Sequence, residues 1–182
     1  KLLRTTTHQI IVVDSLYYGQ SPFGSEFLNT RFKFVKGDIR DSALMNSLER
    51  KADIIIPLAA LVGAPICKLD PVAADSVNKS AILDLFNRIS EQQFIIMPTT
   101  NSAYGTGLEN GYCDENSPLN PISKYAIDKV EVEKSLMNLK ASVSFRLATV
   151  FGMSRRMRLD LLVNDFCYRA MTDGFMVLYE GH

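Results

Sequence analysis

Residues 94–105 read FIIMPTTNSAYG, in which a short apolar run passes directly into a row of small and hydroxyl-bearing residues. The run at 94–97 predicts a strand that is buried on both faces, as in parallel sheets covered by helices. The hydroxyl groups then follow at the carboxyl end of the strand, where open α/β sheets bind their ligands. We therefore expect residues 98–105 to border a ligand site. The alternative is a Thr/Ser-rich turn that only closes the strand.

Similar short apolar runs recur along the chain and alternate with segments of helical length. Further strands are expected at residues 10–13, 32–35, 53–58 and 143–147, and helices at 42–50, 71–91, 122–139 and 159–172. This alternation predicts an α/β fold, a doubly wound parallel sheet with helices on both faces. No repeat or linker interrupts the sequence, so we expect one domain over residues 1–182.

Both ends of the sequence predict an incomplete sheet. Residues 1–4 are typical of the tail of a helix that runs into the strand at 10–13, so we expect the first strand of such a sheet, and the turn after it, to be missing. Residues 176–179 predict a further strand with no closing helix after it. The expected fold is therefore truncated at both ends.

Charge and hydropathy exclude several classes of partner. The 182 residues contain 20 Lys and Arg against 20 Asp and Glu, which leaves no net positive field to attract nucleic acid or an anionic membrane. The longest apolar stretches, such as 54–64, are shorter than the roughly 20 residues of a membrane span, and no signal peptide begins at Lys1. We expect a cytoplasmic protein with a small or charge-mixed ligand.

Cysteine and histidine are too few and too scattered to predict a metal site. Cys67, Cys113 and Cys167 are odd in number and have no paired spacing, which argues against disulfides and zinc. The two histidines, His8 and His182, lie far from each other and from every cysteine. We expect reduced thiols with packing roles and no metal.

Two acidic residues follow the first two predicted strands. Asp14 ends the strand at 10–13, where an acid in a dinucleotide-binding sheet accepts hydrogen bonds from the adenosine ribose and repels a 2′-phosphate. That position favours NAD over NADP. Asp38, in Gly37-Asp38-Ile39, is placed to take the exocyclic amine of an adenine. Each Asp is equally typical of an ordinary turn after a strand.

Tyr125 and Lys129 are four residues apart in the helix expected at 122–139, so they share one helix face. An ammonium group beside the phenol would lower the pKa of Tyr125 from its usual value of about 10. Tyr125 would then act as a general acid and base near neutral pH, with Thr100 donating to a substrate oxygen beside it. The alternative is a surface helix that carries an unrelated Tyr and Lys.

The order of these motifs resembles the extended short-chain dehydrogenase/reductase family. More narrowly, it is similar to the NAD-dependent epimerase/dehydratase branch that acts on nucleotide-diphosphate sugars, over about residues 5 to 181. The motifs that carry the resemblance are Asp14, Gly37-Asp38-Ile39, Leu58-Ala59-Ala60, Asn78, the segment 99–105, Tyr125 with Lys129, and the segment 146–152.

This resemblance implies a Rossmann-like domain and NAD-dependent epimerisation of a nucleotide-diphosphate sugar through a keto-sugar intermediate. The implied catalytic residues are Tyr125 as the base, Lys129 as its cationic neighbour and Thr100 as the partner of the sugar hydroxyl. The implied cofactor-binding residues are Asp14, Asp38, Ile39, Leu58, Ala59, Ala60, Asn78, Pro98, Thr99, Tyr125, Lys129 and Leu147. The implied substrate-binding residues are Thr100, Asn101, Ser102 and Thr149. The helices at 71–91 and 122–139 match the pair that forms a four-helix homodimer interface in the family.

Several positions depart from the family pattern. The glycine-rich turn that cradles the pyrophosphate is absent from the sequence, and the sugar-binding C-terminal part is expected to lie largely beyond it. Asn101 and Ser102 stand where sugar dehydratases have Asp and Glu, which argues against 4,6-dehydration. Thr149 stands where the family often has Asn, and Pro57 where it often has His. The identity of the sugar substrate is therefore not determined.

Three alternatives accompany this interpretation. The first two are a nucleotide-sugar oxidoreductase and a dehydratase of the same family. The third is a non-catalytic nucleotide-binding or assembly module. Arg155, Arg156 and Arg158 form a cluster that predicts either a phosphate clamp or a solvated loop.

Overall fold

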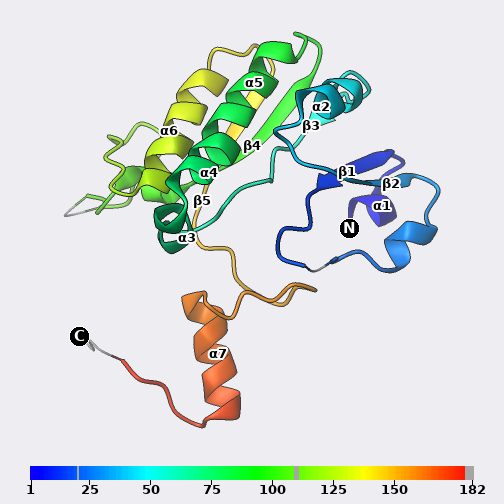
Figure 1. Ribbon diagram of the computed structural model, residues 1–182. Coiled ribbons are helices and arrows are strands. Elements are labelled where there is room, and N and C mark those ends of the chain that lie inside the picture. Colours follow the sequence, from blue (N-terminus) through cyan, green and yellow to red (C-terminus); the bar gives the residue numbers. More distant parts are fainter. Residues whose placement is uncertain (20, 109–110, 179–182) are drawn as a thin grey trace.

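The computed structural model describes residues 1–19, 21–108 and 111–178 (Figure 1). Its strands form two parallel sheets. β1 (Ile10–Asp14) pairs with β2 (Phe32–Lys36), and β4 (Phe94–Thr100) lies between β3 (Ile54–Ile55) and β5 (Ser142–Leu147). The parallel strands and intervening helices confirm the predicted α/β class.

The helices lie between the strands along the chain. They are α1 (Leu2–Thr5), α2 (Ser42–Glu49), α3 (Ala64–Leu69), α4 (Pro71–Asp75), α5 (Ala81–Arg88), α6 (Lys124–Leu136) and α7 (Leu162–Thr172). Two short 3₁₀ helices, η1 (Ser25–Leu28) and η3 (Asn101–Tyr104), and one π turn, η2 (Ser76–Ser80), complete the set. The helix predicted at 71–91 is thus α4, η2 and α5 in succession.

Side-chain caps explain where the main helices begin. The Asp70 carboxylate accepts a hydrogen bond from the Ala73 backbone N–H (2.8 Å) just before Pro71. Ser123 does the same for the Ala126 N–H (3.2 Å) at the start of α6. Each cap satisfies a backbone donor that has no partner within its own helix.

Three strand predictions differ from the structure by more than one residue. β3 is only two residues long, because Pro57 follows closely and lacks the N–H that a longer strand would need. β4 continues beyond Met97 to Thr100 and includes Pro98. It tolerates that proline because β3 pairs only with Phe94 and Ile95, so the rest of β4 has a described strand on one side only.

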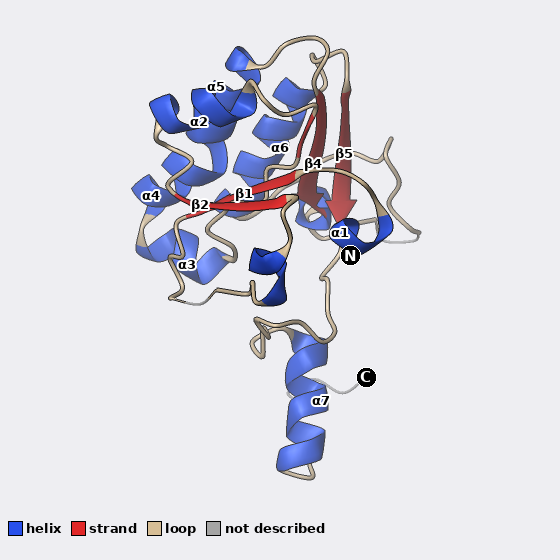
Figure 2. Ribbon diagram, turned by 90° about the vertical axis from the view of Figure 1, so that its right-hand side faces the viewer, coloured by secondary structure: helices blue, strands red, loops and turns tan. Residues whose placement is uncertain are grey.

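The third difference is at the C-terminal side, where the strand predicted at 176–179 is wrong over its described part. Residues 176–178 are irregular and exposed, because no described strand runs beside them, and Tyr179 lies outside the described residues. Helix α7, which precedes them, projects away from the rest of the molecule in both views (Figures 1 and 2).

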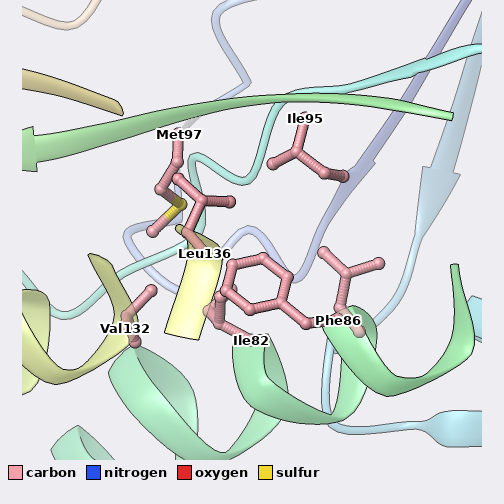
Figure 3. Close-up of a cluster of buried hydrophobic side chains, with 7 residues drawn as sticks. Ile82, Phe86, Ile95, Met97, Val132 and Leu136 are labelled. Atoms are coloured by element: carbon pink, nitrogen blue, oxygen red, sulfur yellow. The ribbon is translucent and has the colours of Figure 1, made fainter. Parts of the chain in front are cut away.

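The core lies between β4 and the helices α5 and α6, which cover it. It is formed by Ile82, Leu85, Phe86, Ile95, Met97, Val132 and Leu136, most of which Figure 3 labels. A second, smaller cluster contains Leu61, Cys67 and Ala74, with Tyr125 packed against it. The two clusters hold α6 against the sheet and fix the direction in which its side chains point.

Candidate active site

Helix α6 places Tyr125 and Lys129 together on its buried side. The ammonium nitrogen of Lys129 lies 5.9 Å from the centroid of the Tyr125 ring, within the range of a cation–π contact. Lys129 is only 3% exposed, whereas Tyr125 is half-buried. Among the residues that the structure describes, none accepts a hydrogen bond from the Lys129 ammonium.

Burial shifts both pKa values, and one shift differs from the prediction. Burial raises the pKa of Tyr125, and the neighbouring Cys67 thiol adds to the rise. The expected lowering is therefore wrong for the structure as it stands, because loss of solvent around the phenol outweighs the cation near its ring. Burial also lowers the pKa of Lys129 to about 8, against the opposing effect of Asp128 and Cys67.

Thr100 ends β4 and begins η3. Its hydroxyl oxygen accepts a hydrogen bond from the Ser102 backbone N–H (3.2 Å), which leaves its own O–H available as a donor. In the parallel register Thr100 lies opposite Leu147 of β5, so two predicted site residues meet at the carboxyl end of the sheet. Helix α6 packs against both β4 and η3.

The neighbouring Thr99 points the other way, into a buried polar network. Its hydroxyl donates to the Glu133 carboxylate (3.0 Å) and lies 3.0 Å from the Ser144 hydroxyl. Glu133 also receives two hydrogen bonds from the Arg146 guanidinium (2.8 and 2.5 Å). Burial raises the pKa of Glu133, but these hydrogen bonds outweigh it and hold that pKa below its usual value. The predicted cofactor role of Thr99 therefore does not extend to its hydroxyl, which is engaged in this interior network.

The turn after η3 is fixed by a glycine. Gly105 has φ +65°, and a Cβ there would lie 2.2 Å from the backbone oxygen of Asn120. A larger residue would push Asn120 away from this turn. A depression of about 860 Å³ runs along β5 beside this turn, and Asn101 and Leu147 line one part of it.

The two predicted adenosine-binding acids lie together at the carboxyl ends of β1 and β2. The Gly37 backbone N–H donates to the Asp14 carbonyl (3.1 Å), which joins the two turns. Asp14 is exposed, and one of its carboxylate oxygens accepts from the Leu16 N–H (2.7 Å). Asp38 is held by the Arg40 guanidinium (2.5 Å), which keeps the pKa of Asp38 below its usual value. Asp38 would have to share its carboxylate to contact an adenine. Ile39 packs against the main core.

Asn78 differs from its predicted position on the cofactor surface. It is fully buried in the π turn, where its amide accepts from the Leu61 N–H (2.8 Å) and donates to the Leu61 carbonyl (2.9 Å). Both polar ends of the side chain are thus committed to the backbone after β3. Asn78 therefore anchors the backbone of Leu61, the residue that follows Leu58-Ala59-Ala60, and its amide is not free for a ligand.

The remaining predicted residues are accessible. Leu58 is 72% exposed, and Asn101, Ser102, Leu147 and Thr149 are all exposed, whereas Pro98, Ala59 and Ala60 are half-buried.

The arginine cluster lies in an exposed loop, as one of the two interpretations predicts, and its guanidinium groups contact other residues of the chain. Arg155 pairs with Glu26 (2.5 Å), and Arg158 with Asp160 (2.6 Å). Arg156 stacks on Tyr18, 3.8 Å from its ring centroid. The loop is therefore attached through Arg155 and Arg156 to the segment that follows β1.

Asp128 and Cys67 beside the predicted pair were given no site role from sequence. Asp128 is fully buried next to Lys129, and Cys67 of α3 is 2% exposed near Tyr125. The available signal was a carboxylate in the middle of a helix whose neighbours, Ala126 and Val130, are apolar. Over the described ranges, no group of three or more His, Cys, Asp or Glu is arranged to hold a metal ion. No described helix is long and apolar enough to cross a membrane.

Parallel strands covered by helices, with a Tyr and a Lys on the helix beside the end of a central strand, define an α/β domain of the Rossmann type. The chain belongs to the NAD dependent epimerase/dehydratase family, whose sequence model matches residues 1–167. This match confirms the family that the motif order predicts.

Individual relatives agree with this assignment. The chain is 30% identical over 172 residues to a Bacillus subtilis protein described as uncharacterized UDP-glucose epimerase YtcB, covering 86% of this chain and 53% of that protein. It is 26% identical over 130 residues to UDP-glucose 4-epimerase of Lactobacillus helveticus, covering 70% and 38%. The chain thus spans about half the length of the curated relatives it matches.

A solved structure shares the fold. The UDP-glucuronic acid 4-epimerase of Bacillus cereus, solved in complex with NAD, superposes with a TM-score of 0.77 at 24% identity. The likeness covers 94% of this chain and 57% of that one. At this identity the comparison confirms the Rossmann-like fold and nothing finer.

Proposed function

We propose that this chain forms the NAD-binding domain and the reaction centre of a nucleotide-sugar epimerase, as one domain over residues 1–182. The observation that carries the proposal is the pairing of Tyr125 with a buried lysine on α6, next to the carboxyl end of β4. The cytoplasm is the proposed compartment, in keeping with three free cysteines and balanced charge.

The described residues suit a dinucleotide. Asp14 offers an exposed carboxylate at the end of β1, where a ribose hydroxyl would find an acceptor. Lys129 offers an ammonium without a hydrogen-bond partner in the described chain, which a ribose oxygen would satisfy. Leu58, Ala59, Ala60, Pro98 and Leu147 would supply apolar walls. When bound, NAD accepts and returns the hydride of the sugar carbon.

Three side chains would take part in the transfer of a proton from the sugar hydroxyl. Tyr125 takes the proton of a sugar hydroxyl and later returns it, so it must be a phenolate when the substrate is oxidised. Lys129 supplies the positive charge that stabilises this phenolate. Thr100 donates its free O–H to the same sugar oxygen and holds it near Tyr125.

The residues after Thr100 favour epimerisation over dehydration. Asn101 and Ser102 are exposed and have no group that exchanges a proton near neutral pH. Elimination of water requires a titrating acid and base near the sugar. We therefore propose that the product is an inverted sugar in which every hydroxyl is retained.

Replacement of the phenol tests this function. The purified protein would be incubated with NAD and, separately, UDP-glucose, UDP-glucuronic acid and dTDP-glucose, and products would be identified by ¹H NMR. For any accepted sugar, Tyr125→Phe should lower kcat by a factor of about 10² to 10⁴. Tyr112→Phe, at a fully exposed tyrosine, is the matched control and should leave kcat unchanged.

The outcomes separate the alternatives. Normal turnover by Tyr125→Phe would refute the proposed role of Tyr125. Accumulation of NADH in step with product would indicate a net oxidoreductase, and a 4-keto-6-deoxy product a dehydratase. NAD binding without conversion of any sugar nucleotide would favour a binding or assembly module.

A further inference from the structure

Helix α6 and strand β5 are joined by a buried ion pair. The Nε and Nη2 atoms of Arg146 both donate to Oε1 of Glu133, at 2.8 and 2.5 Å, and the two side chains are 17% and 8% exposed. The second carboxylate oxygen, Oε2, accepts from the Thr99 and Ser144 hydroxyls, at 3.0 and 3.1 Å. Both oxygens of the Glu133 carboxylate are therefore satisfied, as a buried charge requires.

Arg146 uses its remaining nitrogen to reach a different part of the fold. Its Nη1 donates to the Tyr104 hydroxyl (2.9 Å) and to the Glu115 carbonyl (3.2 Å). The Tyr104 hydroxyl in turn donates to the Asp114 carbonyl (2.8 Å), and the guanidinium lies 5.2 Å from the centroid of the Tyr104 ring. Tyr104 thus receives a hydrogen bond from a guanidinium that Glu133 already holds against α6.

The residue held in this way ends the turn that begins at the proposed site. Tyr104 is the last residue of η3, and Thr100 caps the start of the same turn through the Ser102 N–H (3.2 Å). The Ala103 carbonyl within the turn accepts from the Asn120 N–H (2.9 Å). η3 also packs against α6, the helix of the proposed catalytic base. Its two ends are therefore fixed by different contacts.

The link through Arg146 lies away from the proposed chemistry. Glu133 follows Tyr125 by about two turns of α6, a distance of about 12 Å along the helix axis. The link reaches Thr100 only through the short η3 turn. A 3₁₀ turn has poorer hydrogen-bond geometry than an α-helix, so contacts at its far end help to set where its first residue lies.

We propose, building on the proposed function, that Tyr104 is a positioning residue. Its hydroxyl, held by the pair of Arg146 and Glu133, fixes η3 against α6 and so keeps the Thr100 hydroxyl in place for the sugar oxygen. Tyr104 touches neither substrate nor NAD in this scheme. A displacement of about 1 Å at a reacting group costs a large factor in rate, so loss of the Tyr104 hydroxyl should act on kcat more than on KM.

The direct test is amide hydrogen exchange, measured by NMR without any sugar nucleotide. The N–H groups of Ser102 and Asn120 are the reporter amides, because they bond to Thr100 and to the backbone of η3. Tyr104→Phe keeps the ring and removes only the hydroxyl. Both reporter amides should then exchange about ten-fold faster, well beyond any change at the amide of Val132 in the core of α6.

Ser144→Ala is the matched control. It removes a hydroxyl from the same network, but that hydroxyl bonds to Glu133 and Thr99 and its loss leaves the link from Arg146 to Tyr104 in place. The reporter amides should exchange in this variant at the wild-type rate. Wild-type exchange of the reporter amides in Tyr104→Phe would overturn the proposal, as would an equal rise in both variants.

Catalysis supplies a second readout where turnover of a sugar nucleotide is found. In Tyr104→Phe, kcat should fall about ten- to a hundred-fold while KM changes less than about three-fold, whereas Ser144→Ala should keep the wild-type kcat. A merely structural role would reduce the amount of folded protein and leave kcat per folded molecule unchanged. Wild-type kcat in Tyr104→Phe would therefore reject the positioning role.

A second variant covers the case in which Tyr104→Phe does not fold. Tyr104→Leu removes the same hydroxyl with a smaller apolar side chain, and circular dichroism would establish that it is folded. If neither variant folds, Tyr104 has a structural role and the proposal is rejected. The exchange measurement requires no turnover. A wild-type protein that converts no sugar would therefore refute the proposed function, while exchange of the reporter amides would still decide whether Tyr104 fixes η3.

Discussion

At the scale of single residues, Lys129 is expected to oppose folding at neutral pH. Its pKa is about 8 in the folded protein, against about 10.4 in an unfolded chain. The unfolded chain therefore binds more protons between these values, so the stability of the protein should rise as the pH increases from about 8 to 10. Below about pH 8 the full penalty for burying the charge is present.

Replacing this charge with an apolar side chain of similar length should stabilise the fold. We expect Lys129→Met to raise the free energy of unfolding at pH 7 by up to about 3 kcal/mol, the equivalent of the pKa difference. Urea unfolding at pH 7 and pH 9.5 would measure this, and the gain should shrink at the higher pH. Lys134→Met, at an exposed position of the same helix, should change stability little at either pH. A loss of stability in Lys129→Met at pH 7 would contradict the argument.

At the scale of elements, the π turn η2 and the segment after β3 depend on each other. Asn78 joins them through two hydrogen bonds to the Leu61 backbone, and both residues are buried. Removing the amide leaves a buried N–H and a buried carbonyl without partners. Such groups cost about 1–3 kcal/mol when they are left unsatisfied.

We therefore expect Asn78→Ala to lower the free energy of unfolding by about 2–4 kcal/mol, through two unsatisfied groups and a small cavity. Urea unfolding followed by circular dichroism would measure the loss. Asn87→Ala, at an exposed position of α5, is the control and should change stability by less than about 0.5 kcal/mol. Equal stabilities for the two variants would show that the hydrogen bonds between Asn78 and Leu61 contribute nothing to the free energy of unfolding.

The same elements show why local sequence predicted part of this structure. The apolar runs at 10–13, 32–35 and 94–97 became strands, but only β4 contains buried residues, whereas Ile11 of β1 and Lys33 of β2 are exposed. Helix starts followed from caps and from Pro71, which act within one turn. The π turn has no such local signal. Residues 176–178 satisfied the pattern of a strand but have no described strand to pair with.

The site was predictable in its positions more than in its electrostatics. The spacing of Tyr125 and Lys129 fixes their common helix face, and the structure brings them together. Whether the pKa of Tyr125 rises or falls depends on how α3 and the segment after β3 cover the ring. The spacing of Tyr125 and Lys129 in the sequence carries no information about this burial. The capture of Asp38 by Arg40 and the burial of Asn78 likewise depend on side-chain conformations in the folded chain.

At the scale of the whole molecule, the outer surface of α4 and α6 supports the proposal of a two-fold homodimer. Val72 of α4 is 78% exposed and Ile127 of α6 is 38% exposed, on helices that the Lys124–Asp75 pair ties together. Exposed apolar side chains on adjacent helices are typical of a surface that a partner covers. A two-fold axis would bring the same pair of helices from a second copy against them.

Sedimentation equilibrium at micromolar concentration should therefore give twice the chain mass, and a charge placed on this surface should reverse the association. In Ile127→Asp each copy would bring a new carboxylate into the interface, and burying that charge costs several kcal/mol and favours the monomer. Leu28→Asp is the matched control, because Leu28 is 87% exposed on η1, outside this surface, and should remain dimeric. A wild-type protein that sediments as a monomer, or an Ile127→Asp variant that stays dimeric, would remove α4 and α6 as the interface.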